Sequence, residues 1–256
     1  MKYLRLLFGC MGAMLMAMPM QLPAFETVVI DPGHGGNDEG TAWYHVTEKV
    51  LTIEVARRLE ALLKARGIAT VMTRRYDTYV SLEERAAIGN NNPNSVFVSI
   101  HFNASPSHDV SGFQSFYFFA SPASRVVAES IQQSMITELP SRSRGVTAND
   151  YAVLWRNSGL AVLIECAFIS NKEEGARVST PEGQQAIAEA IADGLMRIKP
   201  VICNDPPETE IARCEIYHKR YDDAARHAEP TKHMASSSTV NVIHTQIKKK
   251  KKKKSA

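Results

Sequence analysis

Between residues 25 and 199, short apolar segments typical of buried strands alternate with longer segments that have the spacing of helices. Residues 27–31 are short, apolar and rich in β-branched side chains, as a buried strand is. Residues 48–66 follow, and their apolar side chains are spaced to line one face of a helix: Leu51, Val55, Leu59 and Leu62. This alternation predicts an α/β fold, a single domain in which helices flank both faces of a central, mostly parallel sheet.

The rest of this region continues the pattern. We expect further strands at residues 68–73, 95–101, 112–119, 151–155 and 160–165. Further helices are expected at residues 81–89, at residues 122–139 and from residue 180 onward. Helix starts are indicated by a possible cap at Thr47, a capping box of Ser81 and Glu84, and a proline after Thr180.

The first 24 residues have the features of a secretory signal peptide. Lys2 and Arg5 precede an uncharged apolar stretch at residues 6–18, which is too short to span a membrane as a helix. A small residue, Ala24, then provides an expected cleavage site. We therefore expect an exported protein of the periplasm or cell envelope, with an uncleaved N-terminal anchor as the alternative.

The C-terminal residues differ in composition from the folded region. Residues 200–230 are a polar extension with a weak helical stripe, and residues 231–256 are expected to be a disordered, low-complexity tail. Seven lysines at 248–254 account for the net charge of +3, which becomes −4 without them. A mildly acidic body argues against a specific nucleic-acid partner, although the lysine tail could attract anionic envelope polymers.

Three cysteines remain once the signal peptide is removed. Cys203 and Cys214 could close a short disulfide loop in an exported protein. Cys166 lies in an apolar strand and is expected to be a buried thiol.

Polar side chains lie where the expected strands end. His34 follows the first strand within a glycine-rich turn, His101 ends the strand at 95–101, and Glu165 ends the strand at 160–165. Glu48 opens the first helix and could reach the same edge of the sheet. Two histidines and one carboxylate form a common catalytic zinc site, and a second, unligated carboxylate can act as a general base. Spacing alone does not decide which glutamate takes which role.

Four segments of the region resemble the zinc-dependent N-acetylmuramoyl-L-alanine amidase family, over about residues 27–197. They are Val-Val-Ile-Asp-Pro-Gly-His-Gly-Gly at 28–36, Glu48-Lys49, Val-Ser-Ile-His-Phe-Asn-Ala at 98–104, and Val-Leu-Ile-Glu at 162–165 with Phe-Ile-Ser-Asn at 168–171. The resemblance implies one zinc ion held by His34, Glu48 and His101, with Glu165 as the catalytic acid and base. It also implies cleavage of the amide between N-acetylmuramic acid and L-alanine in peptidoglycan, during wall remodelling, septum cleavage or recycling.

Family members that act in cell division often carry a helix that blocks the zinc, inserted between the second histidine and the catalytic glutamate. The residues between His101 and Glu165 are taken up by the expected strands and helix. We therefore expect an open site that is active without an activator.

Four further residues have a possible role in the site. Asp31 could orient His34 or cap the turn, and Asn103 could support His101, line the cleft or serve a turn. Arg85 could bind a substrate carboxylate or form a salt bridge on a helix surface. His45, three residues before Glu48, is a rival ligand, although a solvated loop position suits it better.

Three other functions are compatible with these features. The chain could be another zinc peptidase, such as a carboxypeptidase, that acts on peptidoglycan peptides. It could be a peptidoglycan-binding module without catalysis, although all four functional positions are filled. It could also be an envelope adaptor that works through its lysine tail. The expected partners are peptidoglycan or muropeptides, and we expect the protein to be a monomer.

Overall fold

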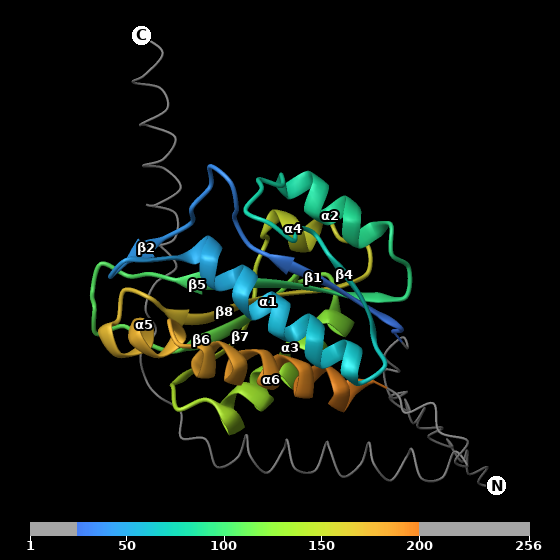
Figure 1. The fold of residues 1–256 in the computed structure, drawn as a ribbon. Coiled ribbons are helices and arrows are strands. Elements are labelled where there is room, and N and C mark those ends of the chain that lie inside the picture. Colours follow the sequence, from blue (N-terminus) through green and yellow to red (C-terminus); the bar gives the residue numbers. More distant parts are fainter. Residues whose placement is uncertain (1–24, 200–256) are drawn as a thin grey trace, which may run out of the picture. The chain divides into compact units, whose positions relative to one another are not determined.

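A six-stranded sheet forms the centre of the computed structural model, which describes residues 25–199 (Figure 1). Its strands are β1 (Thr27–Pro32), β4 (Ala69–Met72), β5 (Ser95–Asn103), β6 (Phe113–Tyr117), β7 (Ser143–Ala148) and β8 (Leu160–Phe168). Their order in space is β4-β1-β5-β8-β6-β7. Only the β6–β8 pair within this sheet is antiparallel. A small hairpin, β2 (Ala42–Trp43) and β3 (Val46–Thr47), stands apart from it.

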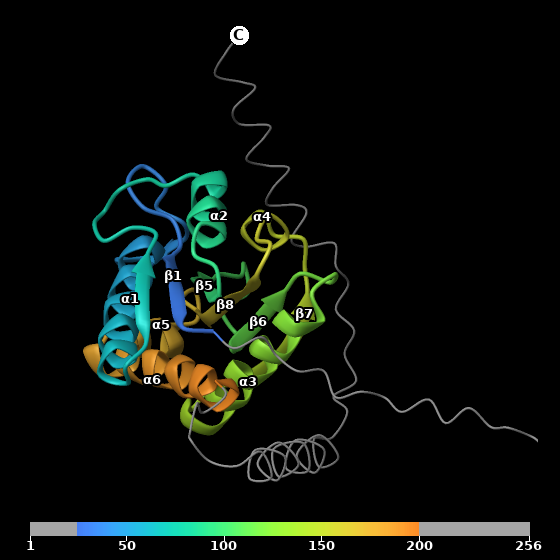
Figure 2. The same cartoon turned by 90° about the vertical axis from the view of Figure 1, so that its right-hand side faces the viewer.

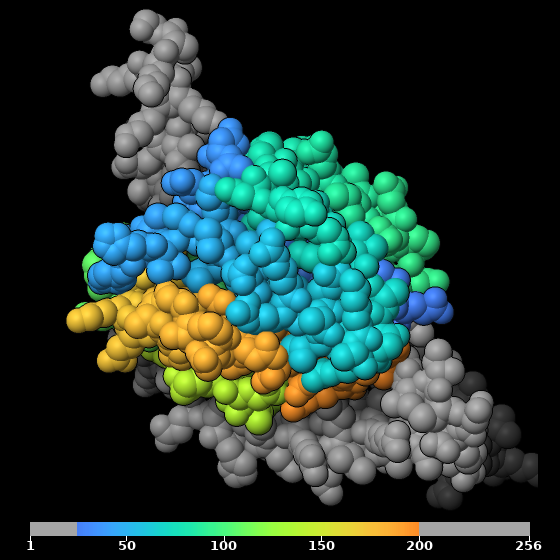
Figure 3. All heavy atoms as spheres, in the orientation of Figure 1, coloured from blue at the N-terminus to red at the C-terminus, as the bar shows by residue number. Residues whose placement is uncertain are grey.

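Helices cover both faces of the sheet, so the predicted α/β fold with a mostly parallel sheet is confirmed (Figures 1 and 2). One face carries α1 (Glu48–Ala65), α3 (Pro122–Glu138) and α6 (Pro181–Ile198). The other carries α2 (Leu82–Asn90) and α4 (Ala152–Trp155), and α5 (Lys172–Val178) follows β8. Figure 3 shows α1 and α6 side by side over the first face.

The strands are apolar on both sides because each side meets a layer of helices. In β1, Val28 and Ile30 pack in the larger core beneath α1, α3 and α6, whereas Val29 packs in the smaller core on the α2 side. Successive side chains of a strand point to opposite faces, so β1 needs an unbroken apolar run. This is why the alternation of apolar segments predicted the layers.

One expected strand is a helix. Residues 152–155 form the short helix α4 rather than part of a strand at 151–155. Five apolar residues in a row carry no period that separates a strand from a buried helix. Tyr151 packs edge-on against Phe116, but Trp155 is 47% exposed and lies beneath the guanidinium of Arg156.

Besides the hairpin of β2 and β3, two elements were not expected, namely β7 and α5. The sequence of β7 is Ser-Arg-Gly-Val-Thr-Ala, which has few apolar residues because β7 is an edge strand. The helix α5 is only seven residues long and is capped by Asn171, whose side chain accepts hydrogen bonds from two backbone N–H groups. Both elements are too short or too polar to produce a periodic pattern.

The predicted helix caps have different outcomes. Ser81 and Glu84 form the capping box, and Thr180 accepts a hydrogen bond from the backbone of Gly183. Thr47 occupies the N-cap position of α1, but its side chain makes no capping hydrogen bond. Cys166 is a buried free thiol, as expected.

Several expectations concern residues outside 25–199. They are the signal peptide at 1–24, the extension at 200–230 with its Cys203–Cys214 pair, and the tail at 231–256. Within residues 25–199, no helix has both the length and the apolar character that a membrane span requires.

The packing of α3 against α6 depends on a glycine. A Cβ atom at position 194 would lie 2.5 Å from the Cα of Ile131, a backbone atom that cannot move alone. We expect Gly194→Ala to lower the free energy of unfolding by about 1–3 kcal/mol, as overpacked cores do, measured by thermal and denaturant unfolding. Gly159→Ala is the matched control, because a Cβ atom there comes no closer than 4.0 Å to its nearest neighbour. Equal stability of the two variants would contradict this packing.

Candidate metal centre

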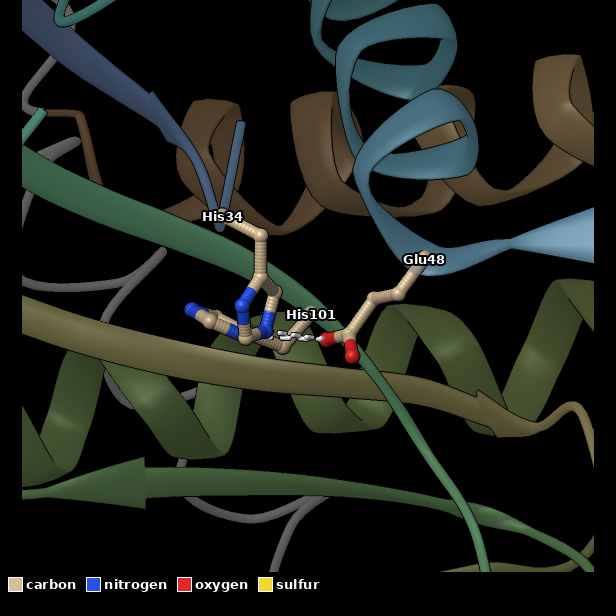
Figure 4. Close-up of side chains that lie close together, drawn as sticks. All are labelled: His34, Glu48 and His101. Carbon is tan, nitrogen blue, oxygen red and sulfur yellow. Dashed lines mark hydrogen bonds and ion pairs between the residues drawn. The ribbon is translucent and has the colours of Figure 1, made fainter. Parts of the chain in front are cut away.

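Three side chains from separate elements meet at one edge of the sheet (Figure 4). His34 follows β1, Glu48 is the first residue of α1, and His101 lies in β5. Glu48 Oε1 lies 3.1 Å from His34 Nε2 and 3.1 Å from His101 Nδ1. One ligand atom from each residue lies within 4.8 Å of the other two. The structure therefore brings together the three residues that the sequence suggested as metal ligands.

The spacing and the donor types suit a divalent metal ion. Ligand atoms about 2.1 Å from a tetrahedral ion lie roughly 3.4 Å from one another, close to the separations in this cluster. Glycines leave room for the side chains: a Cβ atom at Gly33 would lie 2.3 Å from the His101 ring. A Cβ atom at Gly40 would lie 2.5 Å from Glu48 Oε2. The residues present thus fit a metal ion, with two imidazoles and a carboxylate as donors.

Buried arginines hold the turn that carries His34. His34 has a φ of 60°, in the left-handed region that non-glycine residues seldom adopt. Arg85 Nη2 donates to the carbonyl of His34 at 2.6 Å, and Arg74 Nη2 donates to the carbonyl of Gly33 at 2.9 Å. Both guanidinium groups also donate to the carbonyl of Pro32. These hydrogen bonds offset the strain of the turn and fix the direction of the imidazole.

Asp31 and Arg85 form a buried ion pair below the turn. Asp31 Oδ1 lies 2.6 Å from Arg85 Nη1, and Asp31 also accepts hydrogen bonds from Thr73 and Ser99. Arg85 is 3% exposed, so the suggestions of a salt bridge on a helix surface and of a substrate contact do not fit its position. Asp31 acts on His34 only through Arg85 and the backbone, and not by binding the imidazole.

The imidazole of His34 contacts a carboxylate that the sequence analysis did not single out. His34 Nδ1 lies 3.0 Å from Asp38 Oδ1, and the backbones of Gly35 and Asp38 bond each other in both directions. A carboxylate on the outer nitrogen of a metal-binding histidine fixes the orientation and tautomer of the ring. The separation of four residues within a glycine-rich turn was the only available signal.

The charges of the cluster favour its ionised forms. Burial lowers the pKa of His34, but the hydrogen bond and charge of Glu48, with the charge of Asp38, raise it to about 9. Burial opposes ionisation of Glu48, yet the imidazoles of His101 and His34 hold its pKa well below the ordinary value. Backbone N–H groups of Thr41 and Phe102 also donate to this carboxylate. Glu48 is therefore a fixed anion, as a metal ligand must be.

Glu165 lies beside the cluster and differs from Glu48 in its surroundings. It pairs in register with His101 across β5 and β8, on the same face of the sheet. Its Oε2 atom is buried and has no hydrogen-bond partner among the described residues. Burial and the charge of Glu48 raise the pKa of Glu165 to about 8. Such a carboxyl group is poised to exchange a proton.

The remaining suggested residues lie nearby. Asn103 follows His101 on β5, and its side-chain oxygen accepts a hydrogen bond from the backbone of Ala104, which serves the turn. His45 is exposed at the tip of the β2–β3 hairpin and is not part of the cluster. The side chains of His34 and His101 are 23% and 19% exposed, so solvent reaches the centre. The long helix between His101 and Glu165 is α3, which packs against α6 on the opposite face.

Comparison with known proteins identifies similar sequences. The sequence profile of the N-acetylmuramoyl-L-alanine amidase family matches residues 28–197. The chain is 33% identical over 173 residues to the N-acetylmuramoyl-L-alanine amidase LytC of Bacillus subtilis, covering 67% of this chain but only 35% of LytC. It is 32% identical over 206 residues to the germination-specific N-acetylmuramoyl-L-alanine amidase of Bacillus subtilis, covering 74% of this chain and 86% of that protein. The chain thus spans about a third of the length of LytC.

Solved structures of amidases are also similar to this chain. The crystal structure of N-acetylmuramoyl-L-alanine amidase from Clostridium difficile 630 aligns with a TM-score of 0.66 and 34% identity. The alignment covers 71% of this chain and all of that chain. The AmiC2 amidase of Nostoc punctiforme aligns with a TM-score of 0.63 and 32% identity, covering 67% of this chain and 95% of that one.

The cluster predicts how metal content responds to substitution. We expect the purified protein to hold one divalent metal ion per chain, measured by inductively coupled plasma mass spectrometry. His34→Ala removes one of three ligands and should reduce the content severalfold or more after dialysis. His45→Ala is the matched control, since this nearby histidine lies outside the cluster, and it should keep the full content. Loss of metal in the control and not in His34→Ala would refute the ligand assignment.

Proposed function

The chain belongs to the N-acetylmuramoyl-L-alanine amidase family, and we propose that it hydrolyses the amide between N-acetylmuramic acid and L-alanine in peptidoglycan. The observation that carries this proposal is the buried Oε2 atom of Glu165, which has no hydrogen-bond partner within residues 25–199, beside the cluster of His34, Glu48 and His101. A ligand cluster next to a free, proton-exchanging carboxylate is the arrangement that metal-assisted amide hydrolysis requires.

Zinc is the metal that we assign to the cluster. Zinc favours imidazole nitrogen and carboxylate oxygen donors, and catalytic zinc sites use three protein ligands and leave a position for water or substrate. His34, Glu48 and His101 would be these ligands, with Asp38 orienting the His34 ring. When bound, zinc lowers the pKa of water and polarises a carbonyl group.

Glu165 is assigned the proton transfers. Its carboxylate accepts a proton from the attacking water, whose oxygen forms a bond to the amide carbon. It then returns this proton to the amide nitrogen as the carbon–nitrogen bond breaks. The products are the carboxylic acid of the muramic lactyl group and a stem peptide with a free N-terminal amine.

The surroundings of Glu165 suit both directions of transfer. Burial raises its pKa, which makes the carboxylate a stronger base than one in water. Part of the increase comes from the charge of Glu48, and a cation held by the cluster would oppose that charge and favour the ionised form. Glu165 would therefore begin the reaction ionised and still hold a proton long enough to deliver it.

The proposal predicts that Glu165→Gln separates catalysis from metal binding. Glutamine has nearly the same shape but cannot accept the proton, so turnover should fall by about 10²- to 10⁴-fold. Metal content should stay at the level of the unchanged protein. The assay uses purified muropeptides without an added activator, and mass spectrometry identifies the products.

The control and the product masses make this test decisive. Glu173→Gln changes an exposed glutamate on α5 and should keep full turnover. An amidase releases intact stem peptides and peptide-free glycan, whereas a carboxypeptidase shortens the peptide from its C-terminal end. A binding module without catalysis gives no products. Full turnover in Glu165→Gln would show that another group moves the proton.

We also assign the protein to the cell envelope, where its substrate is found. The basic and apolar character of residues 1–24 supports export through a signal peptide, and residues 25–199 would be the catalytic domain. The polar extension at 200–230 and the lysine-rich tail at 231–256 would lie outside the catalytic domain. Relatives described as cell wall amidases support an envelope location.

Deletion of the lysine run tests the alternative that the protein is an envelope adaptor that works through its tail. A hydrolase whose chemistry lies within residues 25–199 should keep its turnover on soluble muropeptides after deletion of residues 248–254. Binding to anionic envelope polymers should weaken, and more so at low salt, because seven positive charges are removed. Turnover and sedimentation with isolated cell walls measure the two effects. Loss of turnover on soluble substrate would argue that the tail takes part in the reaction.

A further inference from the structure

A row of side chains crosses four neighbouring strands beside the metal centre. His101 on β5 pairs in register with Glu165 on β8, and Glu165 pairs with Gln114 on β6. Phe113 pairs with Ser143 and Ser115 pairs with Val146, so a bulge in β7 places Arg144 and Gly145 opposite Gln114. The row therefore runs from His101 through Glu165 and Gln114 to Arg144.

Gln114 and Glu165 point to the same face of the sheet. Phe116 and Leu163, each two residues away in its strand, both pack in the smaller core on the α2 side. On the opposite face, Gln132 of α3 bonds Ser115 and Ser143. The helix α3 thus covers the far side of β6 and β7 and leaves Gln114 beside Glu165.

Arg144 carries a positive charge at the open end of the row. Its side chain is exposed, and Nη1 donates a hydrogen bond to the carbonyl of Ser111 at 3.4 Å. Within residues 25–199, Arg144 forms no ion pair with a carboxylate. The guanidinium carbon lies 5.1 Å from the centre of the Phe168 ring, near the end of β8. Gln114 donates a hydrogen bond to Thr147 at 2.9 Å, which ties β6 to β7. Bulges next to active sites often redirect a side chain in this way.

The proposed reaction fixes how the substrate lies in the site, and this orientation determines which part of the substrate contacts the row. Glu165 delivers a proton to the amide nitrogen, so this nitrogen lies toward Glu165 and the carbonyl lies toward the metal ligands. The peptide that begins at this nitrogen then continues past Glu165, away from His101. Gln114 and Arg144 are the next positions on that side.

We propose that Gln114 and Arg144 bind the leaving stem peptide, and that Arg144 pairs with a carboxylate of that peptide. This inference rests on the proposed amidase function and adds a specificity for acidic stems. Gln114 offers an amide that can bond the peptide backbone, and Arg144 offers a planar, charged donor for a carboxylate.

The distances agree with a short peptide. Neighbouring strands lie about 4.8 Å apart, so the backbone of Arg144 is about 10 Å from that of Glu165. An extended peptide covers roughly 3.5 Å per residue. A carboxylate on the second or third residue of the stem therefore comes within reach of the arginine side chain.

The test compares two substrates that differ by one carboxylate. They are N-acetylmuramoyl-L-Ala-D-Glu and its amidated form, N-acetylmuramoyl-L-Ala-D-isoglutamine. With the acidic substrate, Arg144→Ala should raise KM about three- to tenfold and leave kcat within about twofold. With the amidated substrate, the rise in KM should be smaller, and Arg144→Glu should raise KM for the acidic substrate further. Arg142→Ala, an exposed arginine two residues away, should change neither substrate.

A second measurement does not depend on turnover. Nuclear magnetic resonance titration of the full chain with the free dipeptide L-Ala-D-Glu reports binding directly, and Arg144→Ala should weaken that binding by a similar factor. Unchanged binding and unchanged KM in Arg144→Ala would overturn the inference, as would equal losses for both substrates. If the dipeptide binds through Arg144 but no variant or wild-type protein releases peptide, the proposed function fails while this peptide site stands.

Discussion

Two buried guanidinium groups hold the backbone carbonyls of residues 32–34, and the metal centre depends on this contact. Arg74 and Arg85 donate hydrogen bonds to the carbonyls of this turn, and Asp31 balances part of their charge. Leaving either arginine without these partners would expose a buried charge to an apolar interior, which is costly. The turn therefore cannot relax, and His34 keeps a strained φ that aims its ring at Glu48.

The carboxyl groups of Glu48 and Glu165 differ in pKa because they have different hydrogen-bond partners and neighbouring charges. Glu48 receives backbone N–H groups and faces two imidazoles, so its charge is stabilised. Glu165 sits one strand away from His101 with an oxygen that no described residue contacts. The carboxyl pKa is therefore lowered in Glu48, at the start of a helix, and raised in Glu165, within a buried strand. The sequence alone could name both residues but could not measure this difference.

The alternation of apolar segments predicted the layers, and the polar residues expected at strand ends predicted the residues of the centre. Polar residues that end apolar strands must meet at one edge of a parallel sheet, which is how His34, His101 and Glu165 were found. Partners of buried charges escaped prediction, since Arg85 reaches Asp31 from 54 residues away. Asp38 escaped because a carboxylate in a glycine-rich turn has many ordinary uses. The short helix α4 was predicted as a strand because the five apolar residues at 151–155 carry no period.

The reversed direction of β6 has a consequence for how enzymes with this architecture could diverge. Because β6 runs antiparallel to β8, it starts at the edge where β5 and β8 end, and the loop at residues 104–112 leads directly into it. A one-residue change in that loop that shifted the register would turn a different side chain toward Glu165. Recognition of the leaving fragment is therefore encoded in loop length and bulge placement, whereas bond cleavage is encoded elsewhere. Substitutions in the loop or the bulge could therefore change which fragment is recognised without changing the residues that cleave the bond.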